Sequence, residues 1–474
     1  MRRVKVICTI GPASAHQEII SSLVRAGMDV ARLNFSHGSH EEHAQVIEWI
    51  RFEAARQQKP IAILQDLQGP KIRIGALSGG SAELLRGKTI VLTPERILGN
   101  SEQVSVISPE FFRLAPVHGR ILMDDGVIEL KVIKRGVKGI LCKVVYGGIL
   151  RDHKGLNLPG VRIRSQSLTP KDHEDLRFGL EHGVDCVAIS FVRTPRDVLQ
   201  AKAVIRSAGR HVPLIAKIER TEAITNLDAV LKVADGVMVA RGDLGVETSL
   251  EEVPILQKEI ILKANDARLP VITATQMLES MVSSPRPTRA EASDVANAVL
   301  DGTDAVMLSA ETASGQYPVE AVETMVRIIN HTEKMLLKRP KEQIMPGTLM
   351  VSFPDAISAA TSHIAHEIGA RAISTFTQSG ATARILSKHR PEAPIIAFTP
   401  DATVQNQMAL LWGVTPKRLP PVETTEELIN QMEKELLAGR LAKKGDVVII
   451  LSGAPISRWG ETNLMTLHRI GQND

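Results

Sequence analysis

The chain has 474 residues, of which 43% are hydrophobic and 23% charged, and this composition is typical of a globular enzyme with a sizeable core. The formal net charge is only +4 with both signs interspersed, and aromatic residues make up 3%, so a nucleic-acid partner is not expected. The three cysteines, Cys8, Cys142 and Cys186, are far apart and predict reduced thiols.

The N-terminal Met-Arg-Arg does not open a signal peptide, because the apolar run after it contains Lys5 and ends at Gly11 and Pro12. No stretch is apolar over the length that a bilayer requires. We therefore expect a cytoplasmic protein that does not bind a membrane.

Eight apolar runs of strand length recur along the chain, and helical patterns separate them. Continuous apolar character with intervening helices is typical of a parallel sheet covered on both faces. Eight such units predict an α/β fold with a closed (β/α)8 TIM barrel, and an open doubly wound sheet is the alternative. The runs are residues 4–10, 30–34, 61–66, 186–190, 214–218, 236–240, 271–275 and 305–308.

Polar side chains follow nearly every run, at the end where the chain leaves the strand. In a parallel barrel these ends meet at one mouth, where catalytic groups gather. The polar residues are Arg32, Asn34, Asp66, Ser190, Lys217, Glu219, Arg241, Asp243, Thr275 and Glu311.

Lys217, Glu219 and Asp243 form the most informative group. Lys217 and Glu219 are two residues apart, so they point the same way on a strand, and Asp243 follows the next run. Two carboxylates hold a divalent cation with open positions for substrate oxygens, and a lysine beside them stabilises negative charge on such an oxygen. An isolated Lys-x-Glu pair is also typical of a surface salt bridge. The second carboxylate favours the metal site.

The spacing of the runs predicts three domains. Between the third and fourth runs, segments at residues 88–93 and 121–133 alternate polar and apolar residues with glycine turns, which predicts an inserted small β-barrel acting as a lid. Near residue 345 a linker-like stretch precedes a second α/β pattern, with a helix at 355–369 and strands at 372–377, 395–399 and 447–451. We expect the catalytic barrel at 1–70 and 168–344, the lid at 71–167 and a C-terminal domain at 345–474.

Eight sequence segments make the chain resemble the pyruvate kinase family along nearly its whole length. They are CTIGPA at 8–13, ARLNFSHG at 31–38, GPKIR at 69–73, KGLNLPG at 154–160, AKIE at 216–219, VARGDLG at 239–245, ATQMLESM at 274–281 and PTRAEASD at 287–294. The resemblance, to the bacterial type, implies transfer of the phosphoryl group of phosphoenolpyruvate to ADP, giving pyruvate and ATP. It also implies a mobile lid, an allosteric C-terminal effector domain and a homotetramer.

The resemblance gives roles to the residues at the barrel mouth. Glu219 and Asp243 correspond to ligands of Mg²⁺, for which Mn²⁺ can substitute, and Lys217 lies beside the transferred phosphoryl group. Thr275 lies where the enolate is protonated and orders a water, because a threonine hydroxyl has no pKa suited to acid catalysis. The backbone of Gly242 and Asp243 would hold the substrate carboxylate.

Two arginines, Arg32 and Arg73, would clamp the phosphoryl group during transfer, since a guanidinium binds phosphate through two parallel bonds. The resemblance also assigns five residues to the nucleotide: Asn34, His37, Arg73, Lys154 and Asn157.

The chain departs from the family members that require K⁺. The residues that match the K⁺ ligands are Asn34, Ser36 and Asp66. Beyond them, the potassium-requiring members carry Thr, Lys and Glu where this chain has Leu67, Gln68 and Lys71, and Ile74 also replaces a polar residue. The ammonium of Lys71 would take the place of the cation, and Leu67 removes an oxygen ligand. We therefore expect activity that does not depend on K⁺.

An effector site is expected in the C-terminal domain. The segment that contains Thr377, Ser379, Gly380 and Thr382, with the stretch from 452 to 463, resembles a site for a sugar phosphate or a nucleotide monophosphate. Ser-Gly pairs after strands offer backbone amides to a phosphate, and they are equally typical of simple turns.

Three other functions are compatible with part of the pattern. A Mg²⁺-dependent pyruvate-enolate aldolase would use the same carboxylates and lysine, but it has no evident need for Arg73 and Lys154. A non-catalytic binding protein on this scaffold would be expected to have lost some of the mouth residues. Schiff-base chemistry at Lys217 is disfavoured, because two flanking carboxylates would keep the lysine protonated.

Overall fold

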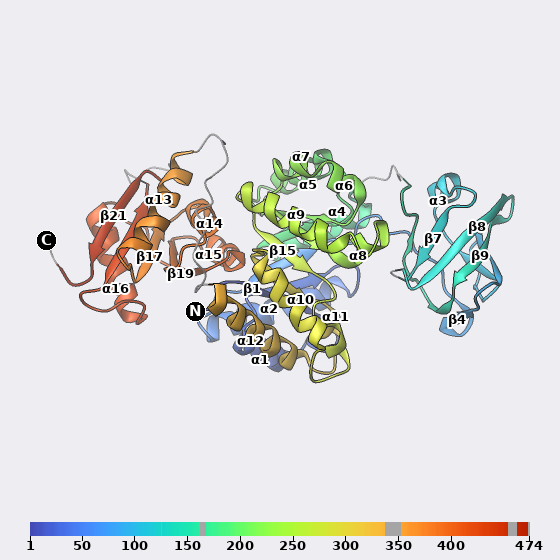
Figure 1. Cartoon of the computed structure of the whole chain (residues 1–474), viewed down its shortest axis with the longest axis horizontal. Coiled ribbons are helices and arrows are strands. Elements are labelled where there is room, and N and C mark those ends of the chain that lie inside the picture. Colours follow the sequence, from blue (N-terminus) through green and yellow to red (C-terminus); the bar gives the residue numbers. More distant parts are fainter. Residues whose placement is uncertain (125, 162–166, 337–351, 454–461, 473–474) are drawn as a thin grey trace.

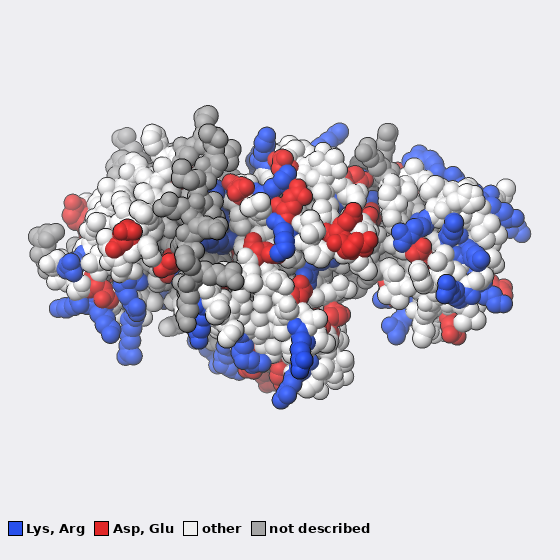
Figure 2. Space-filling view, in the orientation of Figure 1, with Lys and Arg blue, Asp and Glu red and all other residues white. Residues whose placement is uncertain are grey.

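The computed structural model describes residues 1–124, 126–161, 167–336, 352–453 and 462–472. Three bodies follow one another along the longest axis of the molecule (Figure 1). The C-terminal domain lies at one end, a barrel in the middle, and an inserted β domain, which we name the lid, at the other. Side chains of both charge signs cover the visible faces of the barrel and the C-terminal domain, while Lys and Arg prevail on the lid (Figure 2). In the described ranges, no helix has the length and apolarity needed to cross a membrane.

Eight parallel strands close the central barrel, because β1 pairs with both β2 and β16. This confirms the expected (β/α)8 fold and excludes the open sheet. Every residue of these strands except two in β2 is buried, which explains why the sequence shows unbroken apolar runs. The strands are β1 Lys5–Ile10, β2 Val30–Asn34, β3 Ala62–Asp66, β12 Cys186–Ile189, β13 Leu214–Ile218, β14 Gly236–Ala240, β15 Val271–Ala274 and β16 Ala305–Leu308.

Helices surround the barrel, and their starts are encoded locally. Ser39, Thr169 and Thr288 each form a capping box with the acidic residue three positions later, which satisfies two backbone amides at the helix start. The helices are α1 Gln17–Ala26, α2 His40–Arg56, α4 Pro170–Glu181, α5 Pro195–Ser207, α6 Thr221–Thr225, α7 Leu227–Leu231, α8 Arg241–Glu247, α9 Val253–Asp266, η2 Glu279–Val282, α10 Arg289–Leu300, α11 Ala310–Ala313 and α12 Pro318–Leu336.

The lid follows β3 in the chain and precedes α4. Its strands form a six-stranded sheet in the order β11-β7-β8-β9-β5-β6 and a two-stranded sheet of β4 and β10, so the inserted small β domain is present as two sheets among the described residues. The alternating segments expected at 88–93 and 121–133 are β5 and the β7–β8 hairpin. The lid elements are η1 Ser78–Gly80, β4 Ser81–Leu84, β5 Thr89–Thr93, β6 Gln103–Ser105, α3 Pro109–Leu114, β7 Arg120–Met123, β8 Ile128–Gly136, β9 Gly139–Tyr146, β10 Gly148–Arg151 and β11 Leu156–Asn157.

The C-terminal domain is an α/β domain with a five-stranded sheet in the order β19-β18-β17-β20-β21, in which β21 alone runs antiparallel. Neither edge strand was expected from the sequence. Pro416 lies within β19 and interrupts the strand pattern in the sequence. An edge strand tolerates a proline because one side of the strand needs no hydrogen bonds to a neighbour. The elements are α13 Phe353–Glu367, β17 Ala372–Phe376, α14 Ala381–Lys388, β18 Ile395–Thr399, α15 Ala402–Gln407, η3 Met408–Leu410, β19 Val414–Arg418, α16 Thr425–Ala438, β20 Val447–Ser452 and β21 Leu464–Arg469.

The C-terminal domain closes the floor of the barrel. Ala409 and Leu410 of η3 belong to the same buried apolar cluster as the residues inside the barrel. The side chain of Lys388 is fully buried and forms an ion pair with Asp304, whose other oxygen lies 2.9 Å from Arg390. Asp304 directly precedes β16, so a buried charge cluster joins the C-terminal domain to the amino-terminal end of a barrel strand.

Candidate active site at the barrel mouth

Lys217 lies at the centre of the polar groups at the barrel mouth. Its ammonium is 2.7 Å from Ser190 Oγ, 2.9 Å from Glu219 Oε1 and 3.2 Å from Asp66 Oδ1. Burial opposes the charge of Lys217, but Asp66 and Glu219 outweigh burial and raise its pKa above the ordinary lysine value, with a smaller contribution from Asp243. Lys217 is therefore a fixed positive charge and not a neutral amine, which argues against Schiff-base chemistry.

Asp66 binds two cations at once. Arg32 donates from Nε to Asp66 Oδ2 at 2.7 Å, and a second guanidinium nitrogen lies at the same distance, while Lys217 approaches the other oxygen. Arg32 also donates to Thr9 Oγ1 at 2.9 Å. Asp66 is 1% exposed. Burial alone would raise its pKa, but Lys217 and Arg32 lower it below the ordinary aspartate value. The carboxylate therefore stays ionised and orients both cations.

Glu219 and Asp243 offer carboxylate oxygens just beyond the ends of two neighbouring strands. Glu219 follows β13 and accepts the backbone amide of Phe191 at 2.9 Å, while Asp243 lies in the first turn of α8, directly after β14. Over the described ranges, no three His, Cys, Asp or Glu side chains are grouped to hold a metal. A pair of carboxylates leaves positions on a cation such as Mg²⁺ for substrate oxygens and water.

Thr275 holds an unusual backbone conformation just after β15. Its φ is 68°, and that of Gln276 is 53°, in the left-handed region that β-branched residues rarely adopt. Thr275 Oγ1 accepts the Gly242 amide at 2.8 Å and donates to the Ala274 carbonyl at 2.6 Å. Arg241 binds the Thr275 carbonyl at 2.8 Å. Gly242 and Thr275 were both expected to contact the substrate, and they are adjacent in the structure. The Gly242 amide, expected to hold the substrate carboxylate, donates its hydrogen bond to Thr275.

Four basic side chains act electrostatically on His37, which lies three residues after the end of β2. Burial, followed by the positive charges of Arg73, Arg32, Lys71 and Lys154, lowers the pKa of His37. A neutral imidazole in a field of cations is suited to a polyanionic ligand such as a nucleotide diphosphate. The sequence-predicted nucleotide residues His37, Arg73 and Lys154 therefore share one electrostatic environment.

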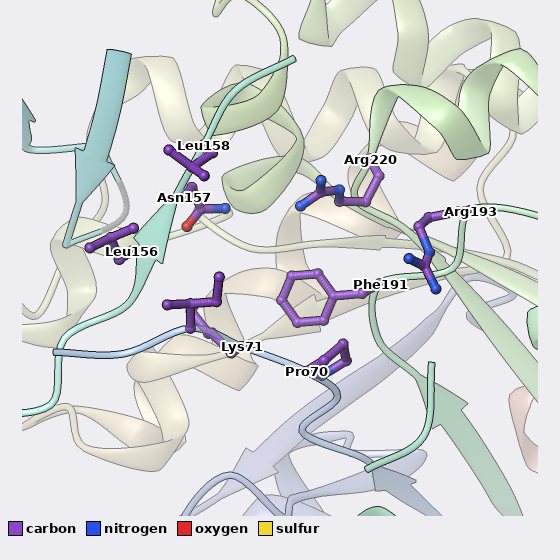
Figure 3. Close-up of a pocket in the computed structure, with 9 residues that line it drawn as sticks. Pro70, Lys71, Leu156, Asn157, Leu158, Phe191, Arg193 and Arg220 are labelled. Atoms are coloured by element: carbon purple, nitrogen blue, oxygen red, sulfur yellow. The ribbon is translucent and has the colours of Figure 1, made fainter. Parts of the chain in front are cut away.

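Three of the residues expected to bind the nucleotide, Arg73, Lys154 and Asn157, belong to the lid. Arg73 donates to the His153 carbonyl at 3.0 Å, and Lys154 lies 2.7 Å from Asp124. Asn157 donates to Glu247 Oε1 on the barrel at 3.2 Å. Phe191 and Arg220 from the barrel lie opposite Asn157 across a small pocket between lid and barrel (Figure 3).

The expected monovalent-cation positions divide into two groups. Asn34 and Asp66 are paired across β2 and β3, and the Ser36 amide donates to Asn34 Oδ1 at 3.2 Å. Lys71 has its ammonium 3.8 Å from Asp243 Oδ1, which places it beside an expected metal ligand.

The expected effector residues lie around the start of α14. Thr377 accepts the Gly380 amide at 3.0 Å, and Thr382 Oγ1 lies 2.6 Å from Thr462 Oγ1. Ser379, between them, is exposed. Residues 454–461 of the second expected effector segment lie outside the described residues.

Comparisons with known proteins place this architecture in one family. The model of the pyruvate kinase barrel domain matches residues 1–322, and that of the pyruvate kinase alpha/beta domain matches residues 355–468. The chain is 46% identical over 472 residues to a pyruvate kinase of Geobacillus stearothermophilus, covering 99% of this chain and 80% of the relative. It is 45% identical over 473 residues to that of Mycobacterium tuberculosis strain H37Rv, covering 100% and 99%. The chain belongs to the pyruvate kinase family.

A solved structure agrees with this assignment. The crystal structure of a pyruvate kinase from Cryptosporidium parvum matches with a TM-score of 0.89 and 37% identity, over 99% of this chain and 96% of that one. The reaction of this pyruvate kinase is therefore the transfer of the phosphoryl group of phosphoenolpyruvate to ADP, and the aldolase and binding-protein alternatives are not favoured.

Several residues of this kinase site were not singled out from the sequence. Thr9 holds Arg32, and Arg220 pairs with Glu247 beneath the lid. These residues form contacts between segments far apart in the chain, so no local pattern reveals them. Glu311, expected at the mouth, lies in α11 just after β16. It is buried and accepts the amides of Leu278 and Ser309, so it supports the loop after Thr275.

Asp66→Asn tests whether the shared carboxylate orients the two cations. We expect kcat to fall roughly 10- to 100-fold, because a small misplacement of catalytic charges has an effect of this size. Asp185→Asn is the matched control, since Asp185 is equally buried, binds Arg51, and directly precedes β12 at the floor of the barrel. Steady-state kinetics beside thermal midpoints check the prediction, and an unchanged kcat in Asp66→Asn would contradict it.

Proposed function

We propose that this kinase holds Mg²⁺ through Glu219 and Asp243 and stabilises the charge of the reaction with Lys217. The observation that carries the proposal is the ion-pair geometry of Lys217, which lies 2.9 Å from Glu219 while Asp243 also contributes to its raised pKa. When bound, the cation would lower the energy of the negative charge that builds up on the substrate oxygens. Mn²⁺, which prefers the same oxygen ligands, would substitute.

Each charged residue at the mouth then has one role in phosphoryl transfer. Lys217 neutralises charge shared between the enolate oxygen and the departing phosphoryl group, and removal of one such positioned charge typically lowers the rate by roughly 10²–10³. Arg32, held by Asp66, and Arg73 clamp the phosphoryl group from two sides. His37, Lys154, Asn34 and Asn157 face the nucleotide.

Thr275 and Gly242 complete the substrate side of the proposal. The strained backbone at Thr275 aims its hydroxyl at the Gly242 amide, and we assign the pair to the substrate carboxylate and to the face on which carbon is protonated. The proton would come from a water that Thr275 orders, because its hydroxyl is too weak an acid.

The metal assignment is tested by a coupled assay of ATP formation from phosphoenolpyruvate and ADP, together with Mn²⁺ binding followed by electron paramagnetic resonance. Glu219→Gln and Asp243→Asn should each weaken Mn²⁺ binding by at least about tenfold, since each removes a charged ligand. Glu129→Gln is the control, because Glu129 pairs with Arg120 within the lid. Wild-type Mn²⁺ affinity in either site variant would refute the assignment.

We also propose that the enzyme is of the bacterial, potassium-independent type. The support is the position of Lys71. Its positive charge helps to lower the pKa of His37, and its ammonium lies 3.8 Å from Asp243 Oδ1, where it supplies a fixed cation. Leu67 is buried at 1% exposure and offers no side-chain oxygen.

Potassium independence predicts equal rates in sodium or Tris salts with and without KCl. Lys71→Glu should create a K⁺ requirement or abolish activity, because it exchanges the built-in cation for a carboxylate. Lys88→Glu makes the same charge change at an exposed lid position and should have no such effect. A many-fold stimulation of the wild-type enzyme by KCl would overturn the proposal.

The remaining assignments concern organisation and regulation. We assign residues 1–70 and 168–344 to the catalytic barrel, 71–167 to the lid and 345–474 to the effector domain of a cytoplasmic homotetramer. Thr377, Ser379, Gly380 and Thr382 would bind the phosphate of a sugar phosphate or nucleotide monophosphate, because α14 begins among them and its amino-terminal amides favour an anion.

A steady-state assay with a panel of sugar phosphates and nucleotide monophosphates tests the effector site. At least one compound should shift the half-saturating concentration of phosphoenolpyruvate by about fivefold or more, the usual lower range of allosteric coupling. Ser379→Glu should abolish that shift, because it places a negative charge where the phosphate would bind. A panel without any effect would count against the site.

A further inference from the structure

Arg220 is a buried arginine that directly follows the proposed metal ligand Glu219. It is 6% exposed, and its Nη1 lies 3.0 Å from Glu247 Oε1. Its Nη2 donates to the carbonyl of Val161, in the chain segment that returns from the lid, at 3.3 Å. A buried guanidinium requires such partners, so its contacts are part of the fold and not a chance surface pair.

Glu247 is the point at which barrel and lid meet. It is the last residue of α8, the helix whose first turn carries Asp243, and it is also 6% exposed. Its Oε1 accepts from Arg220 and from Asn157 Nδ2 of the lid, at 3.0 and 3.2 Å, while its buried Oε2 has no hydrogen-bond partner among the residues that the structure describes. Burial raises the pKa of Glu247 in spite of Arg220. One carboxylate oxygen thus joins the two bodies.

A second lid segment comes near the same helix. Gly126 of the lid faces the Val246 side chain of α8, which would lie 3.5 Å from a Cβ atom placed on that glycine. In Figure 3, Asn157 and its neighbours from the lid lie on one side of the pocket, while Arg220 and Arg193 lie on the other, with Phe191 between them. The lid therefore rests on α8 beside the metal-ligand strands.

We propose that Arg220 is a positioning residue that, through Glu247, sets the place of the lid over the active site. The Arg220–Glu247 pair links the segment after Glu219, the helix that carries Asp243, and Asn157 of the lid. Lys154 is three residues before Asn157, so this anchor determines where the lid presents its ammonium to ADP. The part of this proposal that concerns ADP rests on the proposed function, in which Lys154 binds the nucleotide.

The experiment compares Arg220→Met with the double variant Arg220→Met/Glu247→Leu. The single variant leaves a buried carboxylate unpaired and should lower the thermal midpoint. The double variant removes both charges, so its thermal midpoint should return close to the wild-type value. Its KM for ADP should nevertheless stay raised by about tenfold, with a much smaller change in the KM for phosphoenolpyruvate, because the lid has lost its anchor.

Hydrogen exchange gives a readout that does not depend on catalysis. Amides of residues 156–158 should exchange faster in the double variant than in the wild-type chain, at equal thermal stability. Arg51→Met is the control, because Arg51 pairs at 2.7 Å with the buried Asp185 at the barrel floor. It should lose stability without any change in the KM for ADP or in lid exchange.

These measurements distinguish a failure of the Arg220–Glu247 anchor from a failure of the assignment of Lys154 to the nucleotide. A double variant with wild-type KM for ADP and wild-type exchange overturns the anchor. If Lys154→Met leaves the KM for ADP unchanged, the assignment of Lys154 fails, and the exchange of residues 156–158 alone then decides: faster exchange supports the anchor and unchanged exchange overturns it.

Discussion

The candidate active site depends on one buried carboxylate that binds two cations. Asp66 receives Arg32 on one oxygen and Lys217 on the other, in a place where water cannot compete. The cost of burying this charge is offset only while both cations are present, and each cation is in turn held in one orientation. The mouth of the barrel is therefore rigid before any substrate arrives, as electrostatic catalysis requires.

Around Asp66 the charges nearly cancel. Arg32, Lys217 and Lys71 lie against Asp66, Glu219 and Asp243, so each fixed cation has a fixed anion within ion-pair distance. A site balanced in this way accepts an anionic substrate together with a divalent cation without a large change in local charge. The lid adds the positive charges of Arg73 and Lys154 to those of Arg32 and Lys71, and all four lower the pKa of His37.

Most of the barrel and its mouth could be predicted from the sequence, because buried parallel strands leave unbroken apolar runs and their polar ends share one side. The spacing of Lys217 and Glu219 was sufficient to predict that they point the same way. The edge strands β19 and β21 were missed, because an edge strand pairs with a neighbour on one side only and its sequence pattern is weaker. β19 even contains Pro416, which an edge strand tolerates.

What the sequence could not supply is the pairing of residues from distant segments. Thr9 with Arg32, Lys71 with Asp243 and Arg220 with Glu247 each join parts of the chain that only the closed barrel and the seated lid bring together. The positive φ of Thr275 was equally hidden, because nothing in a β-branched residue predicts a conformation that it rarely adopts.

The buried charge cluster at the barrel floor has a mechanical consequence. To slide the C-terminal domain across the barrel, Lys388 and Asp304 would have to separate inside the protein, where neither finds water. The lid, by contrast, is tethered by two chain segments and a few polar contacts. Movement of the C-terminal domain against the barrel would therefore cost more free energy than movement of the lid against the barrel.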